Sequence, residues 1–384
     1  MVVLVVSEGN GSMDLYSQEL AARLDVPKLR TDIYQKNCEL FNIPLFSKRA
    51  LQVVFEDLKF VRDLNRLGCP IHFPNHHFGR YGLFLKVPFI ITVHDLIRYF
   101  DLKGMDTLIH RPNLRDKIYL SLDYLGIKRA RRIIAVSHTT KRDLVKYLGI
   151  PEEKIKVIYE GIDLKTFRPV RERVLPFPYI LYVGSEHPRK NLKALLEAFA
   201  LLKRRDGFED LKLVKVGAAG GNERDFRSDT KAIIKELGLE SEVFFTERVP
   251  VEKLVRFYSN ALCLVLPSLY EGFGFPALEA MACGCPVIVS NRGSLPEIAG
   301  DAALVVNPQD PEEIARAILK IAEDEELRRE LSERGLRRAS LFTWDQAAAE
   351  TAKVYREVER EVRALGLGQR SRLQAELRGT PEIG

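Results

Sequence analysis

Two glutamates are the first residues in this sequence whose type and spacing could do chemistry. Glu271 and Glu279 stand eight positions apart in residues 268–279, which read SLYEGFGFPALE. Ionised carboxylates accept hydrogen bonds, so this pair suits the hydroxyl groups of a sugar or a ribose. Gly272 and Gly274 lie between them and let a ligand approach the backbone closely. The whole string predicts a ligand-binding loop, whereas an isolated pair of glutamates would indicate only a helix surface.

A second segment carries two adjacent cations. Arg189 and Lys190 lie in residues 182–191, which read YVGSEHPRKN, just before a predicted helix. The backbone amides at a helix start already attract anions, and two fixed cations beside them form a clamp for phosphate groups. Cations are slightly unfavourable against the helix dipole at this end, which argues for a role in binding. The pattern predicts a site for the diphosphate of a departing nucleotide.

A histidine and a glycine-containing loop are further candidates. His94 follows the apolar stretch 89–93, and a histidine at a strand end can hydrogen-bond a sugar hydroxyl. The alternative is a core histidine whose partner is Asp95. The loop 9–12 opens the first helix, but Asp14 stands where a dinucleotide-binding loop has its third glycine. No Asp-x-Asp pair occurs in the sequence, which argues against a metal–diphosphate site, and no metal ligands are predicted.

Short apolar segments alternate with helical patterns along most of the chain and must position these residues. The predicted strands are 2–6, 71–73, 89–93, 132–136, 156–159, 179–183, 212–216, 243–246, 261–266, 286–289 and 303–306. Buried strands separated by helices are typical of parallel sheets that are covered on both faces. The fold class is therefore α/β. Sites in such sheets lie at the carboxyl ends of the strands, where the motifs above are found.

The pattern of strands and helices restarts after a proline-containing linker at residues 169–178. This predicts two doubly wound, Rossmann-like domains that face each other across a cleft. A helical period near the end of the chain predicts a helix that closes back on the first domain. The N-terminal domain, the C-terminal domain, the crossover helix and a polar tail are predicted over residues 1–168, 169–345, 346–365 and 366–384.

Composition limits the class of protein. The 384 residues are 46% hydrophobic and 29% charged, as in ordinary soluble globular proteins. Five cysteines, an apolar start without a basic region and the lack of long apolar runs predict a cytoplasmic protein without a signal peptide or a transmembrane helix.

Charge is distributed unevenly along the chain. Residues 1–168 contain 27 Lys and Arg against 19 Asp and Glu, whereas the remainder contains 32 against 34. The first half is therefore basic and the second half is close to neutral. A basic half indicates an anionic partner, such as phosphate, nucleic acid or an acidic membrane surface, or simply a solvated face.

Taken together, these motifs resemble the retaining glycosyltransferases of family 4, which have the GT-B fold. The likeness covers most of the chain. It includes Glu271 and Glu279 with seven residues between them, the segment 189–191, and the Val-His-Asp sequence around His94. Three shorter segments add to it, at residues 134–137, 161–163 and 342–344.

The resemblance implies a role for each site residue. Arg189 and Lys190 would grip the diphosphate of a nucleotide-sugar donor, Glu279 would bind its ribose, and Glu271 the transferred sugar. His94 would contact this sugar from the first domain, so His94, Glu271, Arg189 and Lys190 would be the catalytic residues. The other donor-binding positions implied are Gly11, Gly184, Ser185, Arg248, Val249, Gly272, Phe273, Gly274 and Phe275.

The implied reaction moves a hexose to a saccharide or lipid-linked acceptor, with retention of the anomeric configuration and without a metal or other cofactor. GDP-mannose is the expected donor, and UDP-glucose, another UDP-hexose and dTDP-rhamnose are the alternatives. An epimerase, a phosphorylase and a non-catalytic nucleotide-sugar-binding module are the competing classes. The expected location is the cytoplasm, with peripheral binding to the inner face of an anionic membrane, and no nucleic-acid partner is expected.

Overall fold

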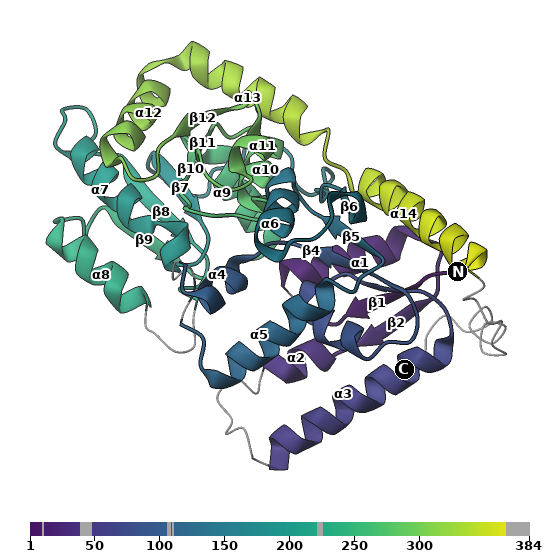
Figure 1. Ribbon diagram of the computed structural model, residues 1–384. Helices are drawn as coiled ribbons and strands as arrows, with labels where there is room; N and C mark the ends of the chain where they lie inside the picture. The colour runs from purple at the N-terminus through teal and green to yellow at the C-terminus, as the bar shows by residue number, and fades with distance from the viewer. Residues whose placement is uncertain (10, 39–47, 106–108, 110, 221–225, 366–384) are drawn as a thin grey trace. The chain divides into compact units, whose positions relative to one another are not determined.

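The structure is a computed structural model that describes residues 1–384 except 10, 39–47, 106–108, 110, 221–225 and 366–384. The predicted polar tail lies outside the described residues. The chain divides into two compact units, each of which contains one sheet (Figure 1). Unit 1 holds the described residues up to Gly161, apart from Ile109, and those from Trp344 onward. Unit 2 holds Ile109 and Ile162–Thr343, whereas the sequence predicts the domain boundaries after residues 168 and 345.

Unit 1 is built on a six-stranded parallel sheet in the order β2-β1-β3-β4-β5-β6. Its strands are β1 (Val3–Ser7), β2 (Lys28–Thr31), β3 (Ile71–Phe73), β4 (Phe89–Val93), β5 (Arg132–Ala135) and β6 (Ile155–Val157). The side chains of β1, β3 and β4 are buried throughout, because helices cover both faces of the sheet. The edge strand β2 is not among the predicted strands. Its sequence, KLRT, lacks the apolar run of a central strand, and its side chains are only partly covered.

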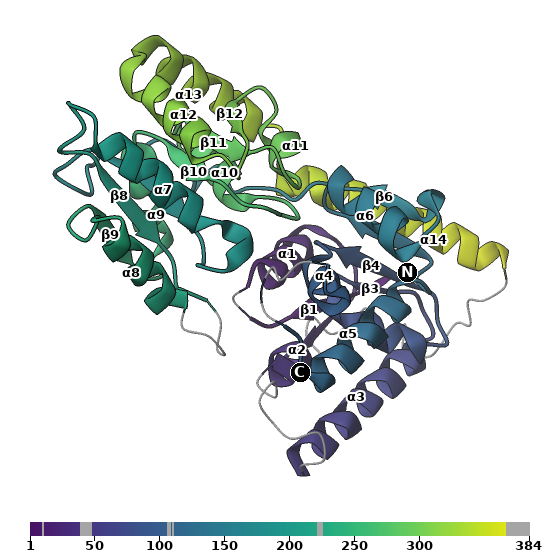
Figure 2. The ribbon, with the colours of Figure 1, turned by 60° about the vertical axis from the view of Figure 1, so that its left-hand side comes forward.

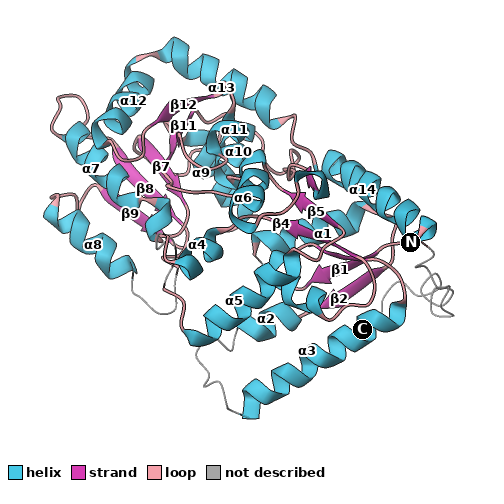
Figure 3. Ribbon diagram, in the orientation of Figure 1, coloured by secondary structure: helices cyan, strands magenta, loops and turns pink. Residues whose placement is uncertain are grey.

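Among the described residues of unit 1, nine helical segments connect or flank these strands (Figure 3). They are α1 (Ser12–Arg23), α2 (Ile33–Cys38), α3 (Lys48–Leu67), η1 (His76–Leu83), α4 (Ile97–Lys103), α5 (Leu114–Ile127), α6 (His138–Leu148), η2 (Glu152–Lys154) and α14 (Trp344–Ala364). Local sequence sets several starts: the Ser137 side chain caps α6 by accepting a hydrogen bond from the Thr140 amide.

The last helix, α14, returns to unit 1 and packs on α1 and β5 (Figures 1 and 2). A buried hydrogen bond of 2.6 Å joins Tyr355 Oη on α14 to His72 Nδ1 on β3. Arg131 and Arg132 at the start of β5 both pair with Glu361. The polar contacts and the apolar face of the helix together hold the end of the described chain on the first sheet.

Unit 2 repeats the plan with a parallel sheet in the order β12-β11-β10-β7-β8-β9. Its strands are β7 (Tyr179–Val183), β8 (Lys212–Val216), β9 (Val243–Thr246), β10 (Leu264–Leu266), β11 (Val287–Ser290) and β12 (Ala303–Val306). Its helical segments are η3 (Pro188–Lys190), α7 (Leu192–Lys203), α8 (Phe226–Glu236), α9 (Val251–Asn260), α10 (Phe275–Ala282), α11 (Leu295–Ala299), α12 (Pro311–Glu323) and α13 (Glu325–Ala339). The two parallel sheets confirm the predicted α/β class. In the part of the chain that the structure describes, no helix is long and apolar enough to cross a membrane.

Candidate functional site

The two strongest motifs lie in loops that follow neighbouring strands of unit 2. β7 and β10 pair in parallel, with Leu181 opposite Leu264, and each loop leaves the carboxyl end of its strand. The strand order also switches here, because the chain adds β8 and β9 on one side of β7 before it adds β10 on the other. Ligands of open α/β sheets bind at such a switch point. Two segments that are distant in sequence therefore form one candidate site.

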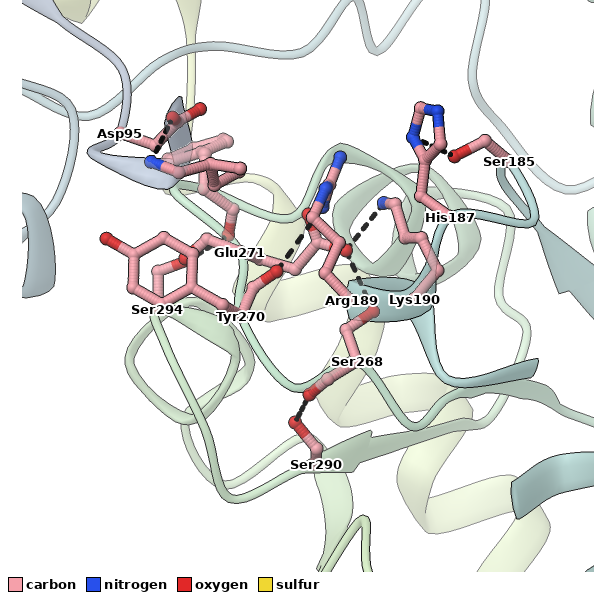
Figure 4. Close-up of polar contacts among 12 residues, drawn as sticks. Asp95, Ser185, His187, Arg189, Lys190, Ser268, Tyr270, Glu271, Ser290 and Ser294 are labelled. Carbon is pink, nitrogen blue, oxygen red and sulfur yellow. Dashed lines mark hydrogen bonds and ion pairs between the residues drawn. The ribbon is translucent and has the colours of Figure 1, made fainter. Parts of the chain in front are cut away.

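The side chains of Arg189, Lys190 and Glu271 form one ion-pair cluster at this point (Figure 4). Lys190 Nζ lies 2.5 Å from Glu271 Oε1, and Arg189 Nη1 lies 2.8 Å from Glu271 Oε2. Ser268 Oγ donates a third hydrogen bond, of 2.8 Å, to Glu271 Oε1. Glu271 and Lys190 are 7% and 8% exposed, so the pair lies almost out of the solvent.

Electrostatics keeps Glu271 ionised. Burial by itself raises the pKa of this carboxyl, but the charges of Lys190 and Arg189 and the hydrogen bonds outweigh it and lower the pKa to about 2. The guanidinium of Arg189 and the ammonium of Lys190 surround one carboxylate, so the cluster has a net positive charge. Such a cluster can bind an anion and can still offer a carboxylate to hydroxyl groups.

The end of β11 and the loop after it support the backbone of the Glu271 segment. Ser294 Oγ donates to the carbonyls of Glu271 and Phe273 at 3.0 and 2.7 Å, and its amide also donates to the Glu271 carbonyl. Ser290 Oγ donates to the Ser268 carbonyl at 2.5 Å (Figure 4). These serines were not among the predicted site residues, because a single serine after a strand carries no distinctive sequence signal.

Gly274 is required by its conformation. Its φ is +108°, in the region that favours glycine, and an added Cβ would lie 2.7 Å from Leu295 Cδ2. It is the N-cap residue of α10, which begins at Phe275. Gly272 and Phe273 are buried, and the ring of Phe273 packs edge-on against the ring of Phe275.

The second glutamate has a different environment. Glu279 lies on α10, is partly buried, and accepts a hydrogen bond of 2.7 Å from Tyr258 Oη on α9. Burial raises the pKa of Glu279, while this hydrogen bond and the charge of Lys190 oppose the change. Tyr258 is a contact that sequence reasoning did not identify. The structure therefore places Glu271 in a cationic cluster and Glu279 beside a phenol.

The loop after β7 is tied to its surroundings at several points. The Leu269 amide donates to the Arg189 carbonyl at 2.7 Å, and Asn191 Nδ2 donates to the Pro267 carbonyl at 3.0 Å, so the two loops are joined directly. Asn191 has a φ of +54° and is the one non-glycine residue in the described ranges with positive φ. Asparagine tolerates that conformation better than most residues.

A buried ion pair anchors the middle of the same loop. Glu186 Oε1 lies 2.9 Å from Lys215 Nζ on β8 and 2.7 Å from Arg227 Nε on α8. The side chains of Glu186 and Lys215 are fully buried. Next to them, Ser185 Oγ hydrogen-bonds His187 Nδ1, and the Ser185 carbonyl accepts from Tyr182 Oη. Lysine in the middle of the apolar strand β8 was the sequence signal that could have revealed this anchor.

His94 in unit 1 has both ring nitrogens bonded to protein groups. Nδ1 lies 2.8 Å from Glu160 Oε1, and Nε2 lies 2.8 Å from the Pro74 carbonyl. A carbonyl only accepts, so Nε2 carries a proton. Burial lowers the pKa of His94, but Glu160 and the hydrogen bonds outweigh it and raise the pKa. The predicted partner of a buried His94 was Asp95, which is wrong: Asp95 Oδ1 accepts from the Ile97 amide.

The remaining predicted positions are more dispersed. The Gly11 amide donates to Asp14 Oδ2 at 3.0 Å, so the aspartate that replaces the third glycine closes this loop on itself. Residue 10 of the loop lies outside the described residues. Arg248 is exposed and Val249 is partly buried, in the loop after β9, which is two strands away from β7. No group of three or more His, Cys, Asp or Glu side chains in the described ranges could hold a metal ion.

Two family models match the chain. Residues 24–166 match the model described as Glycosyltransferase Family 4, and residues 165–338 match the model described as Glycosyl transferases group 1. Together the matches span residues 24–338 and most of both units. The chain therefore belongs to the glycosyltransferases that combine these two domains.

Two individual relatives are similar to this chain at just over 30% sequence identity. O-antigen chain mannosyltransferase B of Escherichia coli is 32% identical over 241 residues, which are 60% of this chain and 62% of that protein. MMP alpha-(1->4)-mannosyltransferase of Mycolicibacterium hassiacum is 31% identical over 231 residues, which are 58% of this chain and 53% of that protein. The matched part thus spans less than two thirds of either relative.

A solved structure of HepE from Anabaena, in complex with UDP and glucose, has the same fold. The TM-score is 0.73 at 19% sequence identity, and the match covers 92% of this chain and 98% of that chain. This likeness confirms the GT-B fold that the sequence predicts.

Proposed function

We propose that this protein transfers a hexose from a nucleotide-sugar donor to a saccharide or lipid-linked acceptor. The observation that carries the proposal is the cluster of Arg189, Lys190 and Glu271 at the switch point of unit 2. The two cations bind the donor diphosphate, and the amides at the start of α10 add a second source of positive potential. Glu271 then accepts hydrogen bonds from the sugar.

The same groups account for the chemistry. Breaking the bond between the sugar and the diphosphate places negative charge on the leaving phosphate. Fixed cations in a nearly dry site stabilise that charge without reorganisation. Arg189 and Lys190 therefore take the part that a metal ion takes in other transferases, and the reaction proceeds without a metal or other cofactor. The acceptor hydroxyl attacks the anomeric carbon on the face from which the diphosphate leaves and passes its proton to the leaving phosphate oxygen, so the anomeric configuration is retained, as the family resemblance implies.

We propose mannose as the sugar and GDP-mannose as the donor. The support is that both relatives described above are named mannosyltransferases. A UDP-hexose is the alternative, because HepE is solved with UDP and glucose. Three residues of the nucleotide site would serve either donor, since diphosphate and ribose are common to both: Arg189, Lys190 and Glu279.

We also propose that the protein works in the cytoplasm at the surface of an anionic membrane. The excess of eight positive charges in residues 1–168 supports this location, because juxtamembrane cations are attracted to anionic lipid. A lipid-linked acceptor would be presented at that surface.

Donor screening followed by turnover tests the reaction. Calorimetry with GDP-mannose, UDP-glucose and dTDP-rhamnose identifies the donor, and release of nucleoside diphosphate with and without saccharide acceptors separates a transferase from a binding module. Lys190→Met should lower kcat/KM by at least about a hundredfold. Lys193→Met is the matched control, because Lys193 lies three positions away with 64% of its side chain exposed. Equal turnover of both variants would remove the diphosphate role.

A further inference from the structure

Helix α3 has large apolar side chains on its outer side as well as on its inner side. Leu51, Val54, Phe55 and Leu58 are 65%, 46%, 70% and 57% exposed. At 3.6 residues per turn these positions fall within an arc of about 100°. The helix packs on the unit through the buried residues Val53, Val61, Leu64 and Leu67. Figures 1 and 2 both draw α3 along the outer edge of unit 1.

A neighbouring loop extends the outer stripe. Asn65 lies in the same arc of α3, and its side chain donates to the Phe84 carbonyl at 3.1 Å and accepts from the Lys86 amide at 2.7 Å. These two bonds hold the loop against the end of the helix. Phe84 is 58% exposed, so a fifth apolar side chain continues the stripe.

Cations surround this stripe. Arg62 lies inside the arc, and Lys59 lies on one flank of it; both are exposed. Lys86 is exposed beside Phe84, and Arg129 Nη1 donates to the Leu83 carbonyl at 2.8 Å. Arg129 belongs to the basic run 128–132, whose members Arg131 and Arg132 instead pair with Glu361. The structure thus brings part of that run to the apolar stripe and uses the rest to hold α14.

We infer that this surface of unit 1 docks on an anionic lipid bilayer. The α3 surface is defined by five apolar and four basic residues: Leu51, Val54, Phe55, Leu58, Phe84, Lys59, Arg62, Lys86 and Arg129. Exposed leucine and phenylalanine side chains enter the boundary between head groups and acyl chains, while the cations meet lipid phosphates. The inference rests on the proposed function, because a lipid-linked acceptor would be presented at this membrane surface.

Charge argues for lipid over a second copy of the chain. Arg62 lies inside the apolar arc, so a symmetric pair of α3 helices would bury this cation near its own copy. The acidic residues of the helix, Glu56, Asp57 and Asp63, lie outside the arc. Asp63 Oδ1 lies 3.4 Å from Arg62 Nε, but Lys59, Lys86 and Arg129 still leave the surface with an excess of positive charge. Like charges that are juxtaposed in an interface are costly, whereas phosphate groups of a bilayer compensate them.

Vesicle cosedimentation tests the inference without any need for turnover. The full chain is mixed with phosphatidylcholine vesicles or with vesicles that also contain phosphatidylglycerol. We expect binding to the anionic vesicles only, weakened by salt. Phe55→Ser should lower the partition coefficient at least about tenfold, because it removes an exposed aromatic side chain that would enter the bilayer. Leu341→Ser is the control, since Leu341 in unit 2 is exposed to a similar extent, at 59%.

A charge variant provides a second, independent readout. Lys59→Gln with Arg62→Gln should lower the partition coefficient by about fivefold for each cation at low salt and should flatten its salt dependence. Donor binding, measured by calorimetry, should stay unchanged in all these variants. If the wild type binds no donor at all, the proposed function is contradicted, whereas the result of the vesicle experiment is unaffected.

Three outcomes would overturn the docking surface. The first is that the wild type binds neutral and anionic vesicles equally. The second is that Phe55→Ser and Leu341→Ser bind the anionic vesicles equally. The third is that the wild type is a dimer in solution and that Phe55→Ser dissociates this dimer without any change in vesicle binding.

Discussion

Lys190 Nζ and Glu271 Oε1 are 2.5 Å apart in a nearly dry environment, so two residues with separate predicted ligands are partners of each other. Lys190 was predicted to bind the diphosphate and Glu271 the sugar. Their contact means that a change of either side chain removes an ion-pair partner of the other. The donor would therefore bind a cluster whose positions and charges are set together.

This ion pair should show as coupling in stability. Lys190→Met leaves the Glu271 carboxylate with only Arg189, and Glu271→Gln leaves two cations close together. Removing one partner of a buried pair costs about 3 kcal/mol of unfolding free energy. The double variant should lose clearly less than the sum of the two single losses. Urea unfolding followed by circular dichroism measures all four proteins, and simple additivity would mean that the pair is not coupled.

The two glutamates should differ in the ligands that they affect. Glu279→Gln should weaken binding of both the free nucleoside diphosphate and the intact donor, by about 1.5–3 kcal/mol, because a charged hydrogen-bond acceptor for the ribose is lost. Glu271→Gln should not weaken nucleoside diphosphate binding, since it removes a negative charge that competes for Arg189 and Lys190, but it should slow transfer. Calorimetry and turnover assays separate the two effects. Parallel losses in both variants would refute the assignment.

Unit 1 should be stabilised by the charged pair of His94 and Glu160. The raised pKa of His94 means that this stabilisation is fully present below its unfolded value near 6.5 and is lost as the pH rises through the folded value. Glu160→Gln should therefore destabilise the unit most at pH 6 and less at higher pH.

The single tryptophan of the chain, Trp344, reports this change, because its ring lies 6.0 Å from Tyr16, which in turn contacts His94. Glu152→Gln is the control, since Glu152 forms an exposed ion pair in the same unit. A loss in Glu160→Gln that does not vary with pH would show that the histidine does not titrate as argued.

Transfer should persist in EDTA. The cations of Arg189 and Lys190 are covalently part of the protein and cannot be removed by a chelator, so the leaving diphosphate keeps its stabilisation. Turnover is measured after dialysis against EDTA and again with added magnesium or manganese. Activity that disappears and returns with the metal would contradict the proposed leaving-group chemistry.

Much of the fold follows from the sequence alone. The predicted strands 71–73, 89–93, 179–183 and 212–216 coincide with β3, β4, β7 and β8. A strand that is buried on both faces is apolar along its whole length, so its local composition reveals it. The edge strand β2 has no such constraint and could not be found in this way.

The motifs also indicated the residue types of the site, because glycine, arginine and glutamate in these patterns reflect local chemistry. Their partners were decided by tertiary structure. Glu271 contacts Lys190, 81 positions away, only because β10 is inserted next to β7. His94 contacts Glu160 only because the carboxyl ends of the parallel strands β4 and β6 lie on the same side of the sheet. Strand order depends on how crossover helices pack across the whole sheet, and no local pattern of residues records it.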